Sequence, residues 1–148
     1  MSALVYAVKP KHRRKPTKRE LELLEMIGAG TGATAAAEEL GLTYWAMKSR
    51  LAKLREVTGL NGLNELVYWG LTEGHIYYKP QGLTCTLTPR HIEVVEGLTV
   101  AKGIHQMAKE FHVTPFGIER RIRVAREKTG AKTQPHLIAI CYTEDWIS

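Results

Sequence analysis

Two basic segments of the chain carry the side chains whose chemistry is easiest to specify. The first reads KSRLAKLR at 48–55 and the second reads ERRIRVAR at 119–126. An arginine can bond two acceptors of one guanine at once, and lysine or arginine can pair with a phosphate. The basic residues of both segments are interleaved with apolar residues at helical spacing, which predicts two helices with basic outward faces.

Two buried stripes are expected to hold these faces outward. They are Met47, Leu51, Leu54 and Thr58 in the first helix, and Ile118, Ile122, Ala125 and Thr129 in the second. Both stripes follow the i, i+4, i+7, i+11 spacing of a helix with one buried side. Each helix is expected to begin at a capping threonine, Thr43 or Thr114, and to end at the glycine of a Thr-Gly pair.

The two helices belong to an internal repeat. Residues 17–70 align with residues 88–141 without a gap, and fourteen positions are identical. A period of this length indicates a duplicated domain, because the units of solenoid proteins are shorter. Each copy is expected to form four helices, the first beginning at Thr17 or Thr88. The predicted fold is therefore all-α, with a basic N-terminal arm (1–16), a first domain (17–71), a linker (72–86) and a second domain (87–148).

The second and third predicted helices of each copy have the spacing of a helix-turn-helix unit. A small residue in the second helix is followed after four residues by a turn position, and six residues later by an apolar residue of the third helix. These positions are Ala37, Gly41 and Met47 in one copy, and Ala108, His112 and Ile118 in the other. His112 stands where glycine is expected, so we expect it to adopt a positive φ.

The two copies resemble the LuxR-type helix-turn-helix domain. TKRELELL (17–24) and TPRHIEVV (88–95) are similar to the family's opening T-P-R-E-x-E-V-L, and AAEELGLTYWAMKSRLAKL and MAKEFHVTPFGIERRIRVA are similar to its two central helices. The resemblance covers two blocks of about 55 residues. It implies that the third helix reads DNA and that the fourth helix dimerises. Promoter-reading domains of sigma factors share the same helical pattern.

Candidate binding residues follow from the outward faces and from the resemblance. The candidate base-reading residues are Lys48, Ser49, Ala52, Lys53, Glu119, Arg120 and Arg123. The candidate phosphate-binding residues in the two copies are Thr43, Arg50, Arg55, Thr114, Arg121 and Arg126. Glu119 can accept a hydrogen bond from cytosine or pair with Arg123 four residues on, and we favour the pairing. Trp45 and Phe116 share one register, where they either pack against another part of the protein or contact the edge of a nucleic acid.

The net charge of +6 is concentrated at the N-terminus. Residues 1–20 hold seven Lys or Arg and one Glu, whereas the remaining residues hold equal numbers of both signs. Such a block is not expected to fold alone, and it acts either as a solvated tail or as an arm for phosphate or the minor groove. Its candidate phosphate-binding residues are Lys9, Lys11, Arg13, Arg14, Lys15 and Lys18.

The sequence contains few other residues or motifs that point to a catalytic, cofactor or metal site. Cys85 and Cys141 show no paired framework, which indicates free thiols in a reducing cytoplasm. We find no phosphate loop, nucleophile elbow or zinc-ligand spacing, so no enzyme, cofactor or metal is expected. No apolar run is long enough to span a membrane. Two β-prone pieces, ALVYAV (3–8) and HIYYK (75–79), could pair as short strands.

The predicted function is sequence-specific binding of double-stranded DNA by a transcriptional regulator in the cytoplasm of a bacterial or phage-infected cell. Because the two basic helices differ, its site is expected to contain two different half-sites. One alternative is site recognition in DNA packaging or recombination, and another is a protein-interaction module that acts on RNA polymerase. Tyr68 and Trp69, in the fourth predicted helix, are the candidate interface of a homodimer.

Overall fold

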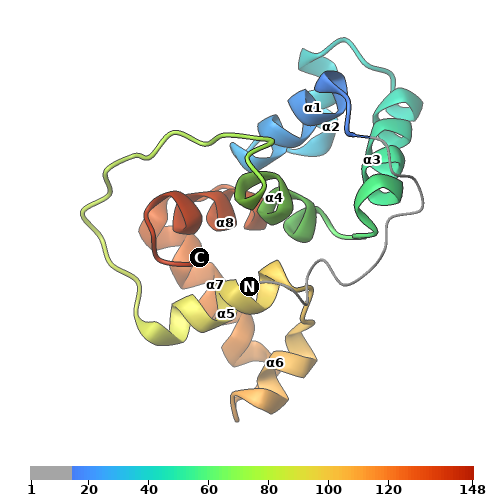
Figure 1. Ribbon diagram of the computed structural model, residues 1–148. Coiled ribbons are helices and arrows are strands. Elements are labelled where there is room, and N and C mark those ends of the chain that lie inside the picture. Colours follow the sequence, from blue (N-terminus) through green and yellow to red (C-terminus); the bar gives the residue numbers. More distant parts are fainter. Residues whose placement is uncertain (1–14) are drawn as a thin grey trace.

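The computed structural model describes residues 15–148, and this part of the chain contains eight α-helices and no β-strand (Figure 1). The helices are α1 (Lys18–Gly28), α2 (Ala33–Glu39), α3 (Tyr44–Thr58), α4 (Leu63–Thr72), α5 (Pro89–Thr99), α6 (Ile104–Glu110), α7 (Pro115–Thr129) and α8 (Gln134–Thr143). The all-α prediction is confirmed for the described residues, and the β-prone segment 75–79 forms no strand. The segment 3–8 and the basic residues Lys9, Lys11, Arg13 and Arg14 lie outside the described residues.

Threonine hydroxyls begin the first and third helix of each half. The N-caps of α1, α3, α5 and α7 are Thr17, Thr43, Thr88 and Thr114. Each hydroxyl accepts a hydrogen bond from the backbone N–H three residues later, which satisfies one of the unpaired donors of the first turn. α3 and α7 end at Gly59 and Gly130, whose φ values of 74° and 76° are left-handed. The predicted caps and stops are confirmed.

The turn before the third helix also repeats. Gly41 has φ 70° and His112 has φ 58°, so both positions are left-handed. Histidine is among the residues that tolerate this conformation better than most. The positive φ expected of His112 is therefore confirmed, and the chain makes the same tight turn in both halves.

Each half packs its third helix against its other helices. α3 contacts α1, α2 and α4, and α7 contacts α5, α6 and α8. The residues of the two predicted stripes are all buried, namely Met47, Leu51, Leu54 and Thr58 in α3 and Ile118, Ile122, Ala125 and Thr129 in α7. Burying these side chains turns the opposite, basic side of each helix outward.

The two halves share one hydrophobic core. α4 packs extensively against α8, and the first helix of each half also contacts the last helix of the other half, as α1 does with α8 and α5 with α4. This reciprocal pattern is that of an isologous dimer interface, formed here within one chain. The segment 73–88 connects the halves around the outside without a helix (Figure 1). The two domains that the sequence separates by a linker are therefore packed against each other.

Tyr68 lies at this intramolecular contact, and the ring of Trp69 packs on His75 just after α4. Only 4% of Tyr68 and 7% of Trp69 is exposed. The Tyr68 hydroxyl donates to the carbonyl of Ser148, and its ring meets Tyr142 edge-on at 6.4 Å between centroids. The burial leaves little of either side chain for a second chain, so a homodimer through the fourth helix stays a prediction that would need other residues.

His136 ties α8 to the connecting segment. Its Nδ1 accepts from the backbone N–H of Lys132 at 3.0 Å, and its Nε2 lies 2.8 Å from the Tyr78 hydroxyl. Because Nδ1 accepts, the neutral ring carries its proton on Nε2 and donates to Tyr78. The ring also faces Gly30, where an added Cβ would lie 2.6 Å from Nδ1. A neutral His136 thus connects the start of α8, the connecting segment at Tyr78 and the loop after α1 at Gly30.

Acid is expected to destabilise the fold through His136. Burial lowers the pKa of His136 below its ordinary 6.5, and the nearby Lys132 charge lowers it further. Below about pH 6.5 the unfolded chain therefore takes up a proton at His136 that the folded chain does not. The contribution of His136 to the free energy of unfolding is complete above 6.5, and it falls as the pH drops from that value toward the folded pKa. Urea unfolding at about pH 7.5 and about pH 5.5 measures this loss.

The variant His136→Gln should lose less stability between these two pH values than the unmodified protein. His91 also has a lowered pKa, because of burial and the charges of Lys128 and Arg121, so part of the acid sensitivity should remain. His105→Gln, at an exposed position of α6, should keep the full sensitivity. An equal acid loss in His136→Gln and the unmodified protein would contradict this role for His136.

Candidate nucleic-acid interface

The outward face of α3 carries the predicted base-reading residues of the first half. Lys48, Ser49, Ala52 and Lys53 are all exposed. Next to them 77% of Trp45 is exposed, and its ring meets that of Tyr44 edge-on. The Lys48 ammonium lies 5.7 Å from the Tyr44 ring centroid, within range of a cation–π interaction. This face combines two cations, a hydroxyl and large aromatic rings.

The outward face of α7 is more strongly charged. Glu119, Arg120 and Arg123 are exposed, and 66% of Phe116 is exposed at the register of Trp45. No ion pair joins Glu119 to Arg123 in the part of the chain that the structure describes, so the pairing that we favoured is wrong. The two arginines are thus available to an outside acceptor.

Trp45 and Phe116 do not pack against another part of the protein to any large extent, since most of each side chain faces solvent. A solvent-facing tryptophan and phenylalanine at matching positions leave apolar area exposed on the same side as the basic residues. Such area is typical of surfaces that bind a partner.

Arg55 and Arg126 hold the loop after the third helix. Arg55 Nε donates to the carbonyl of Asn61 at 2.8 Å. Arg126 Nε donates to the carbonyl of Ala131 at 3.4 Å, and its terminal nitrogen donates to the carbonyl of Lys132. These identical arginines therefore have a structural task in both halves, which the sequence did not reveal, and a phosphate role for them stays a prediction.

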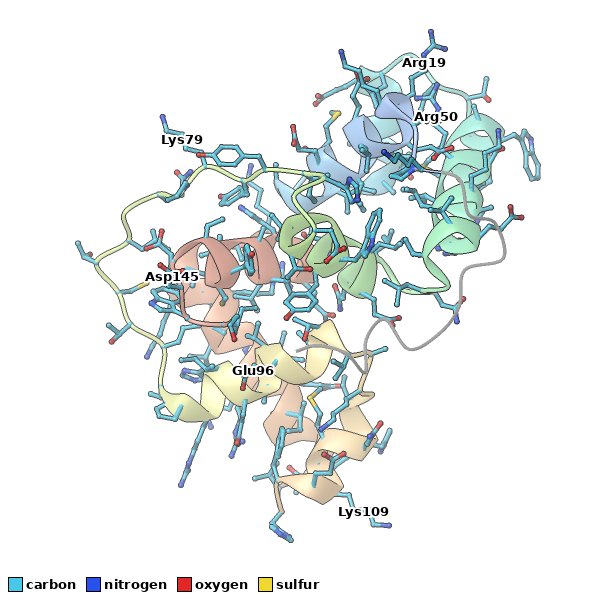
Figure 2. All side chains as sticks on the ribbon, in the orientation of Figure 1. Arg19, Arg50, Lys79, Glu96, Lys109 and Asp145 are labelled. Atoms are coloured by element: carbon cyan, nitrogen blue, oxygen red, sulfur yellow. The ribbon has the colours of Figure 1, made fainter. Side chains whose placement is uncertain are left out.

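Arg121 lies where α7 packs on α5, and Arg50 is the aligned residue of α3. Both are half-buried, and Arg121 pairs with Glu93 of α5 at 3.4 Å. The Arg121 side chain is only 16% exposed, whereas Glu93 is 44% exposed. Figure 2 labels Arg50 together with Arg19, and both lie at the same end of the first half. Arg50 and Arg121 thus lie at the edges of the outward basic faces of α3 and α7.

Thr43 and Thr114 are exposed at the helix ends that adjoin the basic faces. Their hydroxyls accept from the backbone N–H groups of Ala46 at 3.1 Å and of Gly117 at 3.0 Å. The N-terminus of a helix is the positive end of its dipole, which favours a phosphate there. Lys15 and Lys18 are exposed just before and at the start of α1.

A basic groove lies between the start of α5 and the outward side of α7. Its volume is about 470 Å³, and it is lined by Thr88, Arg90, His91, Arg120 and Arg121 together with the apolar Val113, Gly117 and Val124. Arg90 and His91 were missed as candidate residues because they belong to the first helix of the repeat. The signal was present in the repeat itself, since Arg19 and Arg90 are one of the identical pairs.

The described residues offer little other chemistry. No group of three or more His, Cys, Asp or Glu side chains among residues 15–148 is arranged to hold a metal ion. Cys85 and Cys141 are free thiols, and burial raises the pKa of Cys141 to about 12, which suppresses its thiolate. Within the same residues, no helix has the length and apolar character needed to cross a membrane.

Comparison of the chain with protein-family models, curated proteins and solved structures finds no match. Over residues 15–148 the protein is all-helical, and its two repeated halves each present one outward helix with basic residues.

Proposed function

We propose that the chain is a sequence-specific double-stranded DNA-binding protein, built from two helix-turn-helix domains of LuxR-type character and acting as a transcriptional regulator. The observation that carries the proposal is the repeated pairing of a buried apolar stripe with an outward basic face on the third helix of each half. The same arrangement occurs twice although most of the residues on the two faces differ. Such a regulator works on cellular DNA, so the proposal places it in the cytoplasm of a bacterial or phage-infected cell.

Local geometry supports the helix-turn-helix assignment. Ala37 and Ala108 are buried where the second helix meets the third. Their small side chains allow two helices to approach closely, and the left-handed turn residue then reverses the chain within a few residues. The third helix of each half is 15 residues long, about 22 Å at 1.5 Å per residue, which suits one major-groove crossing.

In this proposal α3 and α7 each enter a major groove. Arg120 and Arg123 can each bond O6 and N7 of a guanine, while Lys48, Lys53 and Ser49 offer single donors to base edges. Thr43 and Thr114 lie at helix starts whose N–H groups suit phosphates. Base contacts would thus give the sequence preference, and the helix ends would fix the register.

The packing of α4 on α8 adds a constraint to the DNA site. A flexible link would allow the two half-sites to vary in separation, whereas a shared core holds α3 and α7 at one separation. The two faces also differ at Lys48/Glu119, Ser49/Arg120 and Ala52/Arg123. The expected site therefore has two unlike half-sites at a fixed spacing.

Selection from random duplex DNA at about 150 mM salt, followed by sequencing of the retained fraction, tests the proposal. A split motif with unlike halves and one dominant spacing supports it. Retention without any motif would favour general DNA handling, such as packaging. No retention would overturn the DNA-binding proposal and leave a protein partner such as RNA polymerase as the alternative.

A further inference from the structure

The basic groove of the second half has a counterpart of different chemistry in the first half. The residues at its rim are Arg90, His91, Arg120 and Arg121, and the aligned residues of the first half are Arg19, Glu20, Ser49 and Arg50. Two of the four positions thus keep an arginine. The other two replace a glutamate by a histidine and a serine by an arginine. Both replacements make the second half more favourable to an anion.

The orientation of His91 is determined by its own helix cap. The backbone N–H of Thr88 donates to His91 Nδ1 at 3.3 Å. A neutral imidazole that accepts at Nδ1 carries its hydrogen on Nε2. His91 also feels the positive charges of Lys128 and Arg121, which together with burial lower its pKa. His91 is therefore a neutral ring whose Nε2 can donate a hydrogen bond. Of the three arginines around it, only Arg121 has an ion-pair partner among the described residues.

Glu20 has the same capping role with the opposite consequence. Its Oε1 accepts from the backbone N–H of Thr17 at 3.1 Å, and only 3% of the residue is exposed. A carboxylate at this position only accepts hydrogen bonds, and its negative charge repels a phosphate. The two halves thus use the same capping geometry, but one places a negative charge where the other places a donor.

We propose that the groove bounded by Arg90, His91, Arg120 and Arg121 is a seat for a backbone phosphodiester of DNA, and that the second half is therefore the primary anchor of the protein on DNA. The inference rests on the proposed function and adds that the two halves contribute unequally to the affinity for DNA. Among the described residues Glu93 pairs with Arg121 and no ion pair involves Arg90, which leaves Arg90 to face the phosphate. Arg120 borders the same groove and reaches the adjacent base edge, so the phosphate seat and the base contact lie side by side. The first half then adds sequence preference with less affinity.

The test compares His91→Glu with His91→Gln in binding to a selected duplex. Both replacements can accept from the N–H of Thr88, as Glu20 does in the first half, so both variants should fold. His91→Glu should weaken binding by roughly tenfold or more, and should make the plot of log affinity against log salt shallower by about one. His91→Gln should weaken binding clearly less than His91→Glu, because its amide can still donate a hydrogen bond and adds no charge.

Thr84→Glu is the control for added negative charge, because Thr84 is exposed in the connecting segment. It should have little effect on affinity or salt slope. Equal binding by His91→Glu and Thr84→Glu, in a protein that does bind duplex DNA, would overturn the phosphate seat and leave the proposed function intact. Failure of the unmodified protein to bind duplex DNA would overturn the proposed function, and the inference with it.

Discussion

Replacing Arg120 and Arg123 together by alanine is expected to weaken binding to the selected duplex by about 100-fold or more. Each arginine that bonds a guanine through two hydrogen bonds contributes about 1–3 kcal/mol of discrimination, and the two side chains lie one turn apart on the exposed face of α7. Titration of a labelled duplex measures the loss. A repeated selection should then recover only the half-site that α3 reads.

The matched control removes two positive charges elsewhere. Lys79 lies in the connecting segment and Lys109 near the end of α6, and both are exposed (Figure 2). Lys79→Ala with Lys109→Ala should cost far less affinity and leave the selected motif whole. If both double variants lose affinity equally, general charge rather than the α7 face determines binding.

Replacing Leu66 by alanine is expected to lower the free energy of unfolding of the whole chain by about 2–5 kcal/mol. Leu66 is fully buried in α4, the helix that packs on α8, and its removal leaves a cavity in the shared core. Urea unfolding followed by circular dichroism and by tryptophan fluorescence measures the change. Because the halves share one core, both probes should report a single transition shifted to lower urea.

Val100→Ala provides the control, because Val100 is 41% exposed at the end of α5. It should change stability by less than about 0.5 kcal/mol. Two separate transitions, with only one moved by Leu66→Ala, would show that the halves unfold independently. That result would contradict the cooperative role of the α4–α8 contact.

Helix positions were predictable because their ends are chemically marked. Thr43 and Thr114 had to cap a helix and Gly59 and Gly130 had to stop one, since few other residues do so. The buried stripes followed from spacing alone. The repeat then supported every assignment in one half by the same assignment in the other.

The pairing of α4 with α8 was not predictable in the same way. Both helices are apolar around most of their circumference, so their sequences say that they are buried without saying against what. A second chain was an equally good partner for Tyr68 and Trp69. Only the arrangement of the helices in space identifies α8 as the neighbour of α4.

Single arginines were the least predictable part of the candidate site. Arg55 and Arg126 have the same charge as Arg120, yet they donate to backbone carbonyls of the next loop. Charge and helical register do not distinguish a side chain that bonds its own loop from one that faces solvent. The basic groove was missed for a related reason, because its residues come from two helices that are far apart in sequence.

The contact between α4 and α8 also determines how a reader of the proposed kind responds to its own abundance. Two separate chains must meet before a pair of readers exists, so the pair dissociates on dilution. Here residues 73–88 join the halves covalently, and each chain contains both of them. For a single chain on the DNA site, occupancy should therefore rise with the first power of protein concentration, giving a graded response rather than a threshold.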